Sequence, residues 1–232
     1  MITRKCRKLN RVLQGNKGTT LVEMLVCFVL LAIFFVSATM FISNITELYY
    51  RMKGETYSRQ VSDIILEKIS SEIDGAEYGD SGISNPRYAS DYSYMDLYDK
   101  TDTHVKVMFD SSEKKVKIYY YPITGEVPSK DRAETTWTFD ESVYYGFTVE
   151  DMRIVSANSL AAADSNTDVD IDISDYGLTA VSGGTPAYPN NVAVVLLHIN
   201  HPQYGESYTY RFVRMHNVPE DASLDVETVS TP

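Results

Sequence analysis

The sequence predicts an α+β protein in which a long N-terminal helix, membrane-spanning in its first half, packs on an antiparallel β-sheet domain. No proline interrupts residues 19–74, whereas residues 104–215 contain short runs of β-branched and aromatic residues separated by turns. Closely spaced strands favour an antiparallel sheet with the helix covering one face. At 232 residues and 44% apolar content, the chain can bury one sizeable core and carry an appendage.

Residues 1–18 form a basic leader. They hold six Lys and Arg and no acid, so the rest of the chain carries 15 Lys and Arg against 32 Asp and Glu, a balance of -17. A body of this charge repels nucleic-acid phosphates, so we expect no nucleic acid among its partners. Divalent cations are compatible with it.

An apolar run follows the leader. Every residue from Met24 to Val36 is apolar, and the run resumes after three small residues and extends to about residue 45. This length suits a membrane-spanning helix, for which membrane lipid is the surrounding partner. Because the cations precede the run, we expect the N-terminus in the cytoplasm and the body outside the cytoplasmic membrane.

Three interpretations fit a basic segment followed by an apolar one. The chain is cut after Ala38 as an ordinary signal peptide, stays uncut as an anchor, or is cut between Gly18 and Thr19 with the apolar helix retained. Glu23 distinguishes them, because a carboxylate at membrane depth costs about 2.5 to 3.5 kcal/mol. Only a cut after Gly18 creates an ammonium one helical turn away, at Thr19, and a positive helix end beside the glutamate.

The basic leader ending in Lys17-Gly18, then Thr20-Leu21, Glu23 and an unbroken apolar run, resembles the processing site of type IV prepilins and of the pseudopilins of type II secretion and competence systems. The resemblance covers about 30 residues. It implies that a prepilin peptidase cuts after Gly18, and that Glu23 helps to dock the subunit on other pilin or pseudopilin subunits. The family usually has Phe or Met as the first mature residue where this chain has Thr19, so methylation of Thr19 is left open.

The helix is expected to continue past the membrane to Asp74, with Gly75 suited to its end. Apolar residues recur at spacings of three and four, and charged residues mostly take the other side. The predicted apolar face consists of Tyr57, Val61, Ile64, Ile65, Ile69 and Ile73.

Residues 75–232 are predicted to form the β-rich extracytoplasmic domain. Its first part, residues 75–103, is rich in turn formers and acids and is interpreted as a long loop. Two hairpins are expected, one over residues 104–122 around a turn at 111–113, the other over residues 191–215 around a turn at 201–206. Further strands are expected at residues 135–140, 143–149 and 152–156.

The acidic segment at residues 164–175 is a candidate calcium site. Oxygen-bearing side chains fall at EF-hand spacing, which gives Asp164, Asn166, Asp168 and Asp170 as candidate ligands. Val169 stands where the tight turn of an EF-hand requires glycine. The alternative is a strand whose aspartates form an outer face.

No enzyme motif is present: the sequence has no G-x-S-x-G, Walker or H-E-x-x-H pattern. His198 and His201 are three residues apart, which turns their side chains to opposite faces of a strand and argues against a metal pair. No cofactor other than calcium is expected.

The sequence therefore predicts a structural, non-enzymatic minor subunit of a type IV pilus or of a type II secretion or competence pseudopilus, inserted in the membrane and then assembled at the cell surface. The alternative is a secreted or membrane-anchored surface binding module with an ordinary signal peptide. A surface enzyme has no feature in its favour.

Overall fold

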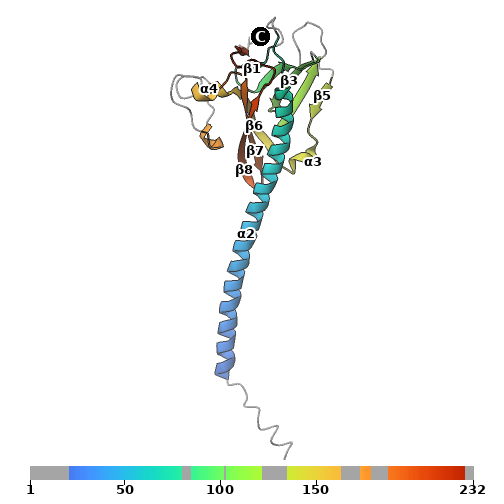
Figure 1. The fold of residues 1–232 in the computed structure, drawn as a ribbon. Helices are drawn as coiled ribbons and strands as arrows, with labels where there is room; N and C mark the ends of the chain where they lie inside the picture. The colour runs from blue at the N-terminus through green and yellow to red at the C-terminus, as the bar shows by residue number, and fades with distance from the viewer. Residues whose placement is uncertain are drawn as a thin grey trace, which may run out of the picture. The chain divides into compact units, whose positions relative to one another are not determined.

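The computed structural model describes residues 21–79, 85–101, 103–121, 135–162, 173–178 and 188–227. The chain divides into two compact units, Met1–Arg51 and Met52–Pro232. The described part of the first unit is helical throughout. The second unit contains the remainder of that helix and every strand that the structure describes, so the predicted α+β class is confirmed (Figure 1).

Helix α2 extends without interruption over Leu21–Asp74, as the sequence predicts. Its second half packs through a buried stripe of residues at helical spacing. The stripe consists of Gly54, Ser58, Val61, Ser62, Ile65, Leu66, Ile69 and Ile73. The prediction for Ile64 was wrong: its side chain is 43% exposed, whereas Leu66 is 1% exposed. The buried stripe follows the side of α2 that carries Val61, Ile65 and Ile69. Leu66 lies at the edge of this side, and Ile64 lies outside it.

The larger sheet has six strands in the order β5-β4-β3-β2-β1-β9. The predicted first hairpin is confirmed, since β3 and β4 pair antiparallel from His104 opposite Tyr121 to Asp110 opposite Lys115. The strands are β1 (Arg87–Ala89), β2 (Tyr94–Tyr98), β3 (His104–Asp110), β4 (Lys115–Tyr121), β5 (Thr135–Thr138) and β9 (Asp225–Glu227). All its pairs are antiparallel except that of β1 with β9, which is parallel.

The loop predicted over residues 75–103 is in part a sheet, because β1 and β2 both lie within it. In β2, Met95 and Leu97 are buried while Tyr94, Asp96 and Tyr98 are half-buried on the other face. This alternation is a strand signal. This strand was not predicted from the sequence because the surrounding aspartates and serines favour turns. That preference is a local property of the sequence, whereas the pairing of a strand depends on residues far away in the chain.

The smaller sheet has three antiparallel strands in the order β6-β7-β8. Strands β7 (Val192–His201) and β8 (Gly205–Arg214) form the predicted second hairpin. Residues 143–156 differ from the two predicted strands: a short helix, α3 (Glu141–Tyr144), precedes one strand, β6 (Thr148–Ser156), with a register shift between Val149 and Asp151. Asp140 caps α3 by accepting a hydrogen bond from the Ser142 backbone N–H at 2.9 Å.

The described part of the second unit also contains two further helical segments, α4 (Ala157–Ala162) and the 3-10 helix η2 (Ile173–Tyr176).

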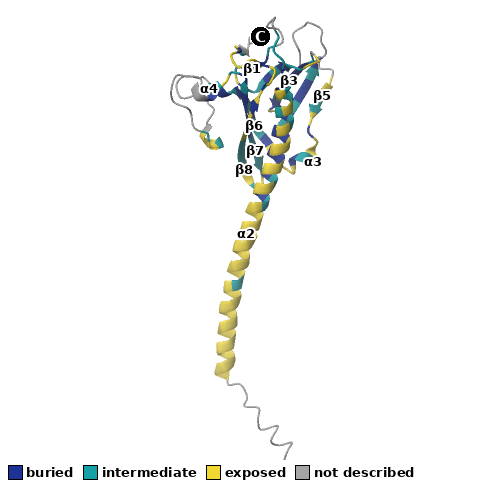
Figure 2. Ribbon diagram, in the orientation of Figure 1, coloured by how far each residue is buried: buried dark blue, intermediate teal, exposed yellow. Residues whose placement is uncertain are grey.

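Helix α2 contacts both sheets within the second unit. The Thr209 hydroxyl in β8 donates to the Ser62 hydroxyl at 3.2 Å, and the Tyr120 hydroxyl in β4 donates to Glu72 at 2.8 Å. Ile69 lies between these contacts and is fully buried. Burial of such a side chain contributes about 1.5 to 3 kcal/mol. Figure 2 shows buried residues where this part of α2 and the strands meet.

Candidate functional site: the N-terminal apolar helix

The first half of α2 is the only helix in the described part of the chain that is long and apolar enough to cross a membrane, and its most apolar stretch has no residue buried inside the protein. Phe28 and Phe34 are each 65% exposed, and Figure 2 shows almost this whole stretch as exposed. An apolar surface this large is unfavourable in water. The helix is therefore consistent with insertion in a membrane.

Three hydroxyl side chains in and next to this stretch form hydrogen bonds with the backbone of the helix itself. The hydroxyls of Ser37, Thr39 and Thr46 each donate to the backbone carbonyl four residues earlier, at 3.0, 2.8 and 2.8 Å. A hydroxyl without a partner is costly in hydrocarbon, where no water can replace it. These bonds make the three side chains compatible with a lipid environment.

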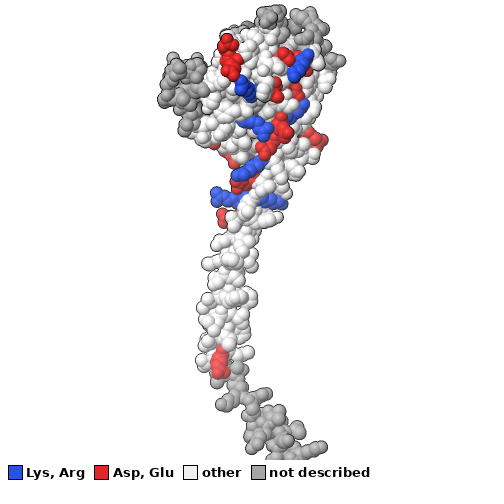
Figure 3. Space-filling model, in the orientation of Figure 1, with Lys and Arg blue, Asp and Glu red and all other residues white. Residues whose placement is uncertain are grey.

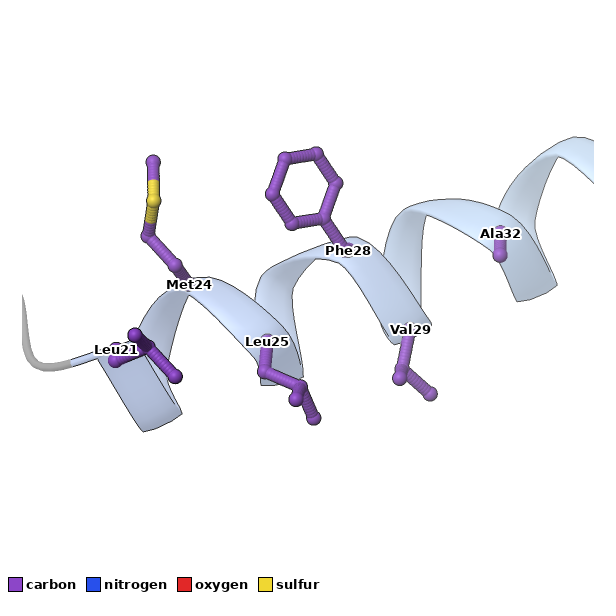
Figure 4. A pocket seen from close by; sticks show the side chains of 6 residues that line it. All are labelled: Leu21, Met24, Leu25, Phe28, Val29 and Ala32. Atoms are coloured by element: carbon purple, nitrogen blue, oxygen red, sulfur yellow. The ribbon is translucent and has the colours of Figure 1, made fainter.

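One face at the beginning of α2 is formed by apolar residues at spacings of three and four. Figure 4 shows that their side chains border one shallow hollow along successive turns. The hollow is lined by Leu21, Met24, Leu25, Phe28, Val29 and Ala32. Ala32 leaves space at the far end, while Phe28 and Met24 project from the helix. Such a surface suits packing against a second helix or against lipid chains.

Glu23 lies in the first turn of α2 and is exposed. It is the sole charged residue between Leu21 and Thr46, and in Figure 3 this part of the helix is white apart from a single acidic group. The unbonded N–H groups of a helix start carry a partial positive charge, which favours a carboxylate there. One carboxylate thus stands at the start of the apolar first part of α2, which is otherwise uncharged as far as Thr46.

The predicted processing residues Lys17, Gly18 and Thr19 lie outside the described residues. The same holds for the candidate calcium ligands Asp164, Asn166, Asp168 and Asp170. The described end of that acidic segment forms η2, so the alternative of a strand does not extend through Ile173. Within the described ranges, no three His, Cys, Asp or Glu side chains are grouped so that they could hold a metal ion.

His198 and His201 have different ring partners. His198 stacks on Tyr208 with centroids 4.1 Å apart, whereas His201 stacks on Tyr204 at 4.4 Å. His201 Nδ1 accepts hydrogen bonds from the backbone N–H groups of Gln203 and Tyr204. These bonds hold the β7–β8 turn.

A group of tyrosines in the second unit was not predicted from the sequence. Tyr57 of α2 stacks on Tyr145, which follows α3, with ring centroids 5.3 Å apart and planes within 9°. Tyr204 of the β7–β8 turn meets Tyr57 edge-on at 6.2 Å. The chain has 18 tyrosines, but their spacing in the sequence does not indicate which of them meet.

In comparisons with known proteins, no family model matches this chain, and no curated protein matches it. What the helix can do therefore follows from the chain's own residues.

Proposed function

We propose that this chain is a structural minor subunit of a type IV pilus, or of a type II secretion or competence pseudopilus. It inserts through residues 24–45 with the N-terminus in the cytoplasm and is cut by a prepilin peptidase between Gly18 and Thr19. It then joins other subunits through the apolar helix and Glu23.

One observation carries the proposal: the position of Glu23 at the start of α2, whose exposed apolar stretch is otherwise uncharged as far as Thr46. A plain signal peptide or membrane anchor has no use for this carboxylate, and inserting it has a cost. In an assembly of parallel helices, the carboxylate pairs with the ammonium of a neighbouring subunit. Sliding by one turn leaves both charges unpaired, so the pair fixes the axial register.

The -17 balance of the chain after the leader supports a subunit present in few copies. Like charges in successive copies of one subunit repel, so a homopolymer of such bodies is disfavoured. A mixed assembly places this body beside others of different charge.

The test is the N-terminal residue of the mature protein isolated from its native host, determined by intact mass and Edman sequencing. We expect a start at Thr19, and a further mass of about one methyl group there reports N-methylation. A start at Thr39 means cleavage after Ala38 and a released binding module. An intact Met1 means an anchored surface protein. Either of the last two results overturns the proposal.

A further inference from the structure

The tyrosine cluster, defined as Tyr57, Tyr145 and Tyr204, lies at the end of the second unit where the chain enters it. That unit begins at Met52, and Tyr57 lies less than two helical turns further along α2. Lys53, in the same stretch, places its Nζ 5.4 Å from the centre of the Tyr57 ring. The cluster thus combines three aromatic rings with one cation.

Close backbone contacts fix the cluster in place. A Cβ added at Gly54 would lie 2.8 Å from Tyr204, so only glycine lets this ring approach α2 so closely. The Tyr204 N–H also donates to His201 Nδ1 at 3.3 Å. Because both the helix side and the turn side are constrained, Tyr204 is held by the fold.

Tyr145 is displayed outward at a conformational cost. Its φ of 49° is in the left-handed region, which a bulky residue rarely adopts, and Gly146 follows with a φ of 84°. One face of the Tyr145 ring stacks on Tyr57, yet 53% of the residue is exposed. This conformation is the one in which Tyr145 ends α3, and it leaves a half-exposed aromatic ring beside Tyr57 that is available for an external contact.

Chain connectivity limits how far this end can lie from the membrane. The inference rests on the proposed insertion of residues 24–45, after which residues 46–51 lead to Met52. Six residues reach at most about 20 Å even when fully extended. The headgroup layer on one side of a bilayer is about 5 to 8 Å thick. Residues beside Met52 are therefore within reach of the lipid surface.

We propose that the tyrosine cluster, with Lys53, is the surface through which the globular body rests on the phospholipid headgroup layer. Tyrosine rings prefer this layer because they have an apolar body and a polar tip. Lys53 adds attraction to lipid phosphate.

The contact gives the body a defined height and orientation on the membrane before assembly. A subunit oriented in this way presents the same side to each partner, which lowers the entropy lost on docking.

The test places a nitroxide on the full-length chain in vesicles of phosphatidylcholine and phosphatidylglycerol that carry nickel chelate on some headgroups. Three single-cysteine proteins are compared: Gln203→Cys, which is exposed beside Tyr204; Ser223→Cys, also exposed; and native Cys27 in the apolar helix. Cys6 is replaced by Ser in all three, and Cys27 in the first two. Ser223 is close to the start of β7, where Asn190 N–H donates to Glu220 O, about 30 Å from the β7–β8 turn.

We expect headgroup nickel to enhance relaxation at residue 203 and not at residue 223. The double variant Lys53→Gln, Tyr145→Ser should lose the enhancement at 203 while keeping the thermal unfolding of the body. For the label at Cys27, accessibility to the lipid chains shows whether the apolar helix is inserted, independently of the headgroup contact at residue 203.

Three results overturn the inference. If Cys27 senses lipid chains but residue 203 relaxes no faster than 223, the body does not rest on the headgroups although insertion holds. If dilution with unlabelled protein abolishes the effect at 203, a second copy covers the cluster. A Cys27 label that senses no lipid contradicts the proposed insertion itself, and the headgroup contact with it.

Discussion

Gly54 and Tyr204 are in direct contact although they come from opposite ends of the second unit's sequence: a Cβ on Gly54 would lie 2.8 Å from the Cβ of Tyr204. Gly54 is buried within α2, where glycine costs about 1 kcal/mol relative to alanine. The glycine is therefore retained for close packing of the β7–β8 turn on the helix.

We expect Gly54→Ala to destabilise the protein, because the overpacking cost of about 1 to 3 kcal/mol exceeds the gain in helix propensity. Urea unfolding of the full chain in detergent measures the effect. Gly75→Ala is the matched control, since its Cβ would be 3.5 Å from the nearest atom, an ordinary contact. Equal stability of the two variants would contradict the packing argument.

Tyr120→Phe tests the link between α2 and the larger sheet. The Tyr120 hydroxyl donates to Glu72 at 2.8 Å, and Lys68 pairs with the same carboxylate. Burial acts to lower the pKa of Lys68, but the hydrogen bond with Glu72, the attraction of its charge and the contact with Tyr120 together outweigh burial and raise the pKa. Losing the hydroxyl should reduce the free energy of unfolding by about 1 kcal/mol.

The same denaturation experiment on Tyr210→Phe provides the control, because the Tyr210 hydroxyl has no hydrogen bond to any described residue and the side chain is 39% exposed. An identical loss in both variants would show that the Tyr120 hydrogen bond contributes nothing.

Asp110 makes stability depend on pH. Its carboxylate accepts from Lys117 at 2.9 Å and from Ser112 at 2.5 Å, and these bonds hold the pKa of Asp110 well below its ordinary value of about 3.9. A lowered folded-state pKa means that the stabilisation is complete above pH 4 or so and is lost as pH falls below it. Asp110→Asn should therefore cost about 1.5 to 3 kcal/mol at pH 7.

The difference between the wild type and Asp110→Asn should shrink as pH is lowered from about 5 toward 2, because Asp110 takes up a proton in the unfolded chain over this range while the folded protein keeps it ionised. Unfolding curves over that range measure it. Asp221→Asn removes an exposed carboxylate that has no ion pair among the described residues, and serves as the control. A difference that is constant with pH would rule out the charged hydrogen bonds as its source.

Glu23→Ala should leave membrane insertion intact, or improve it by removing the cost of a carboxylate at membrane depth. Incorporation into a fibre should fall, because register between subunits loses its charged pair. Membrane fractionation and quantification of the subunit in sheared fibres separate the two effects. Glu47→Ala removes another exposed helical carboxylate, beyond the apolar run, and should assemble normally. If the Glu23 variant were incorporated into fibres as well as the wild type, Glu23 would have no role in docking.

Elements with strong local patterns were predictable from the sequence. The absence of proline and the helical period gave α2 its full length, and alternation on both sides of a turn placed the β3–β4 and β7–β8 hairpins. Residues 85–101 were harder, since their aspartates and serines suit turns and the strand partners of β1 include β9, far away in the chain. A parallel pair between two short strands that are distant in the chain cannot be predicted from any local sequence pattern.

The sequence by itself determined the apolar helix and the isolated charge of Glu23, because hydropathy and charge are properties of each residue and need no neighbours. Only the tertiary structure decided that Tyr57, Tyr145 and Tyr204 form one cluster, and that Gly54 makes room for it. These residues come from a helix, a turn and a hairpin. Their contacts exist only after long-range packing has brought the three segments together.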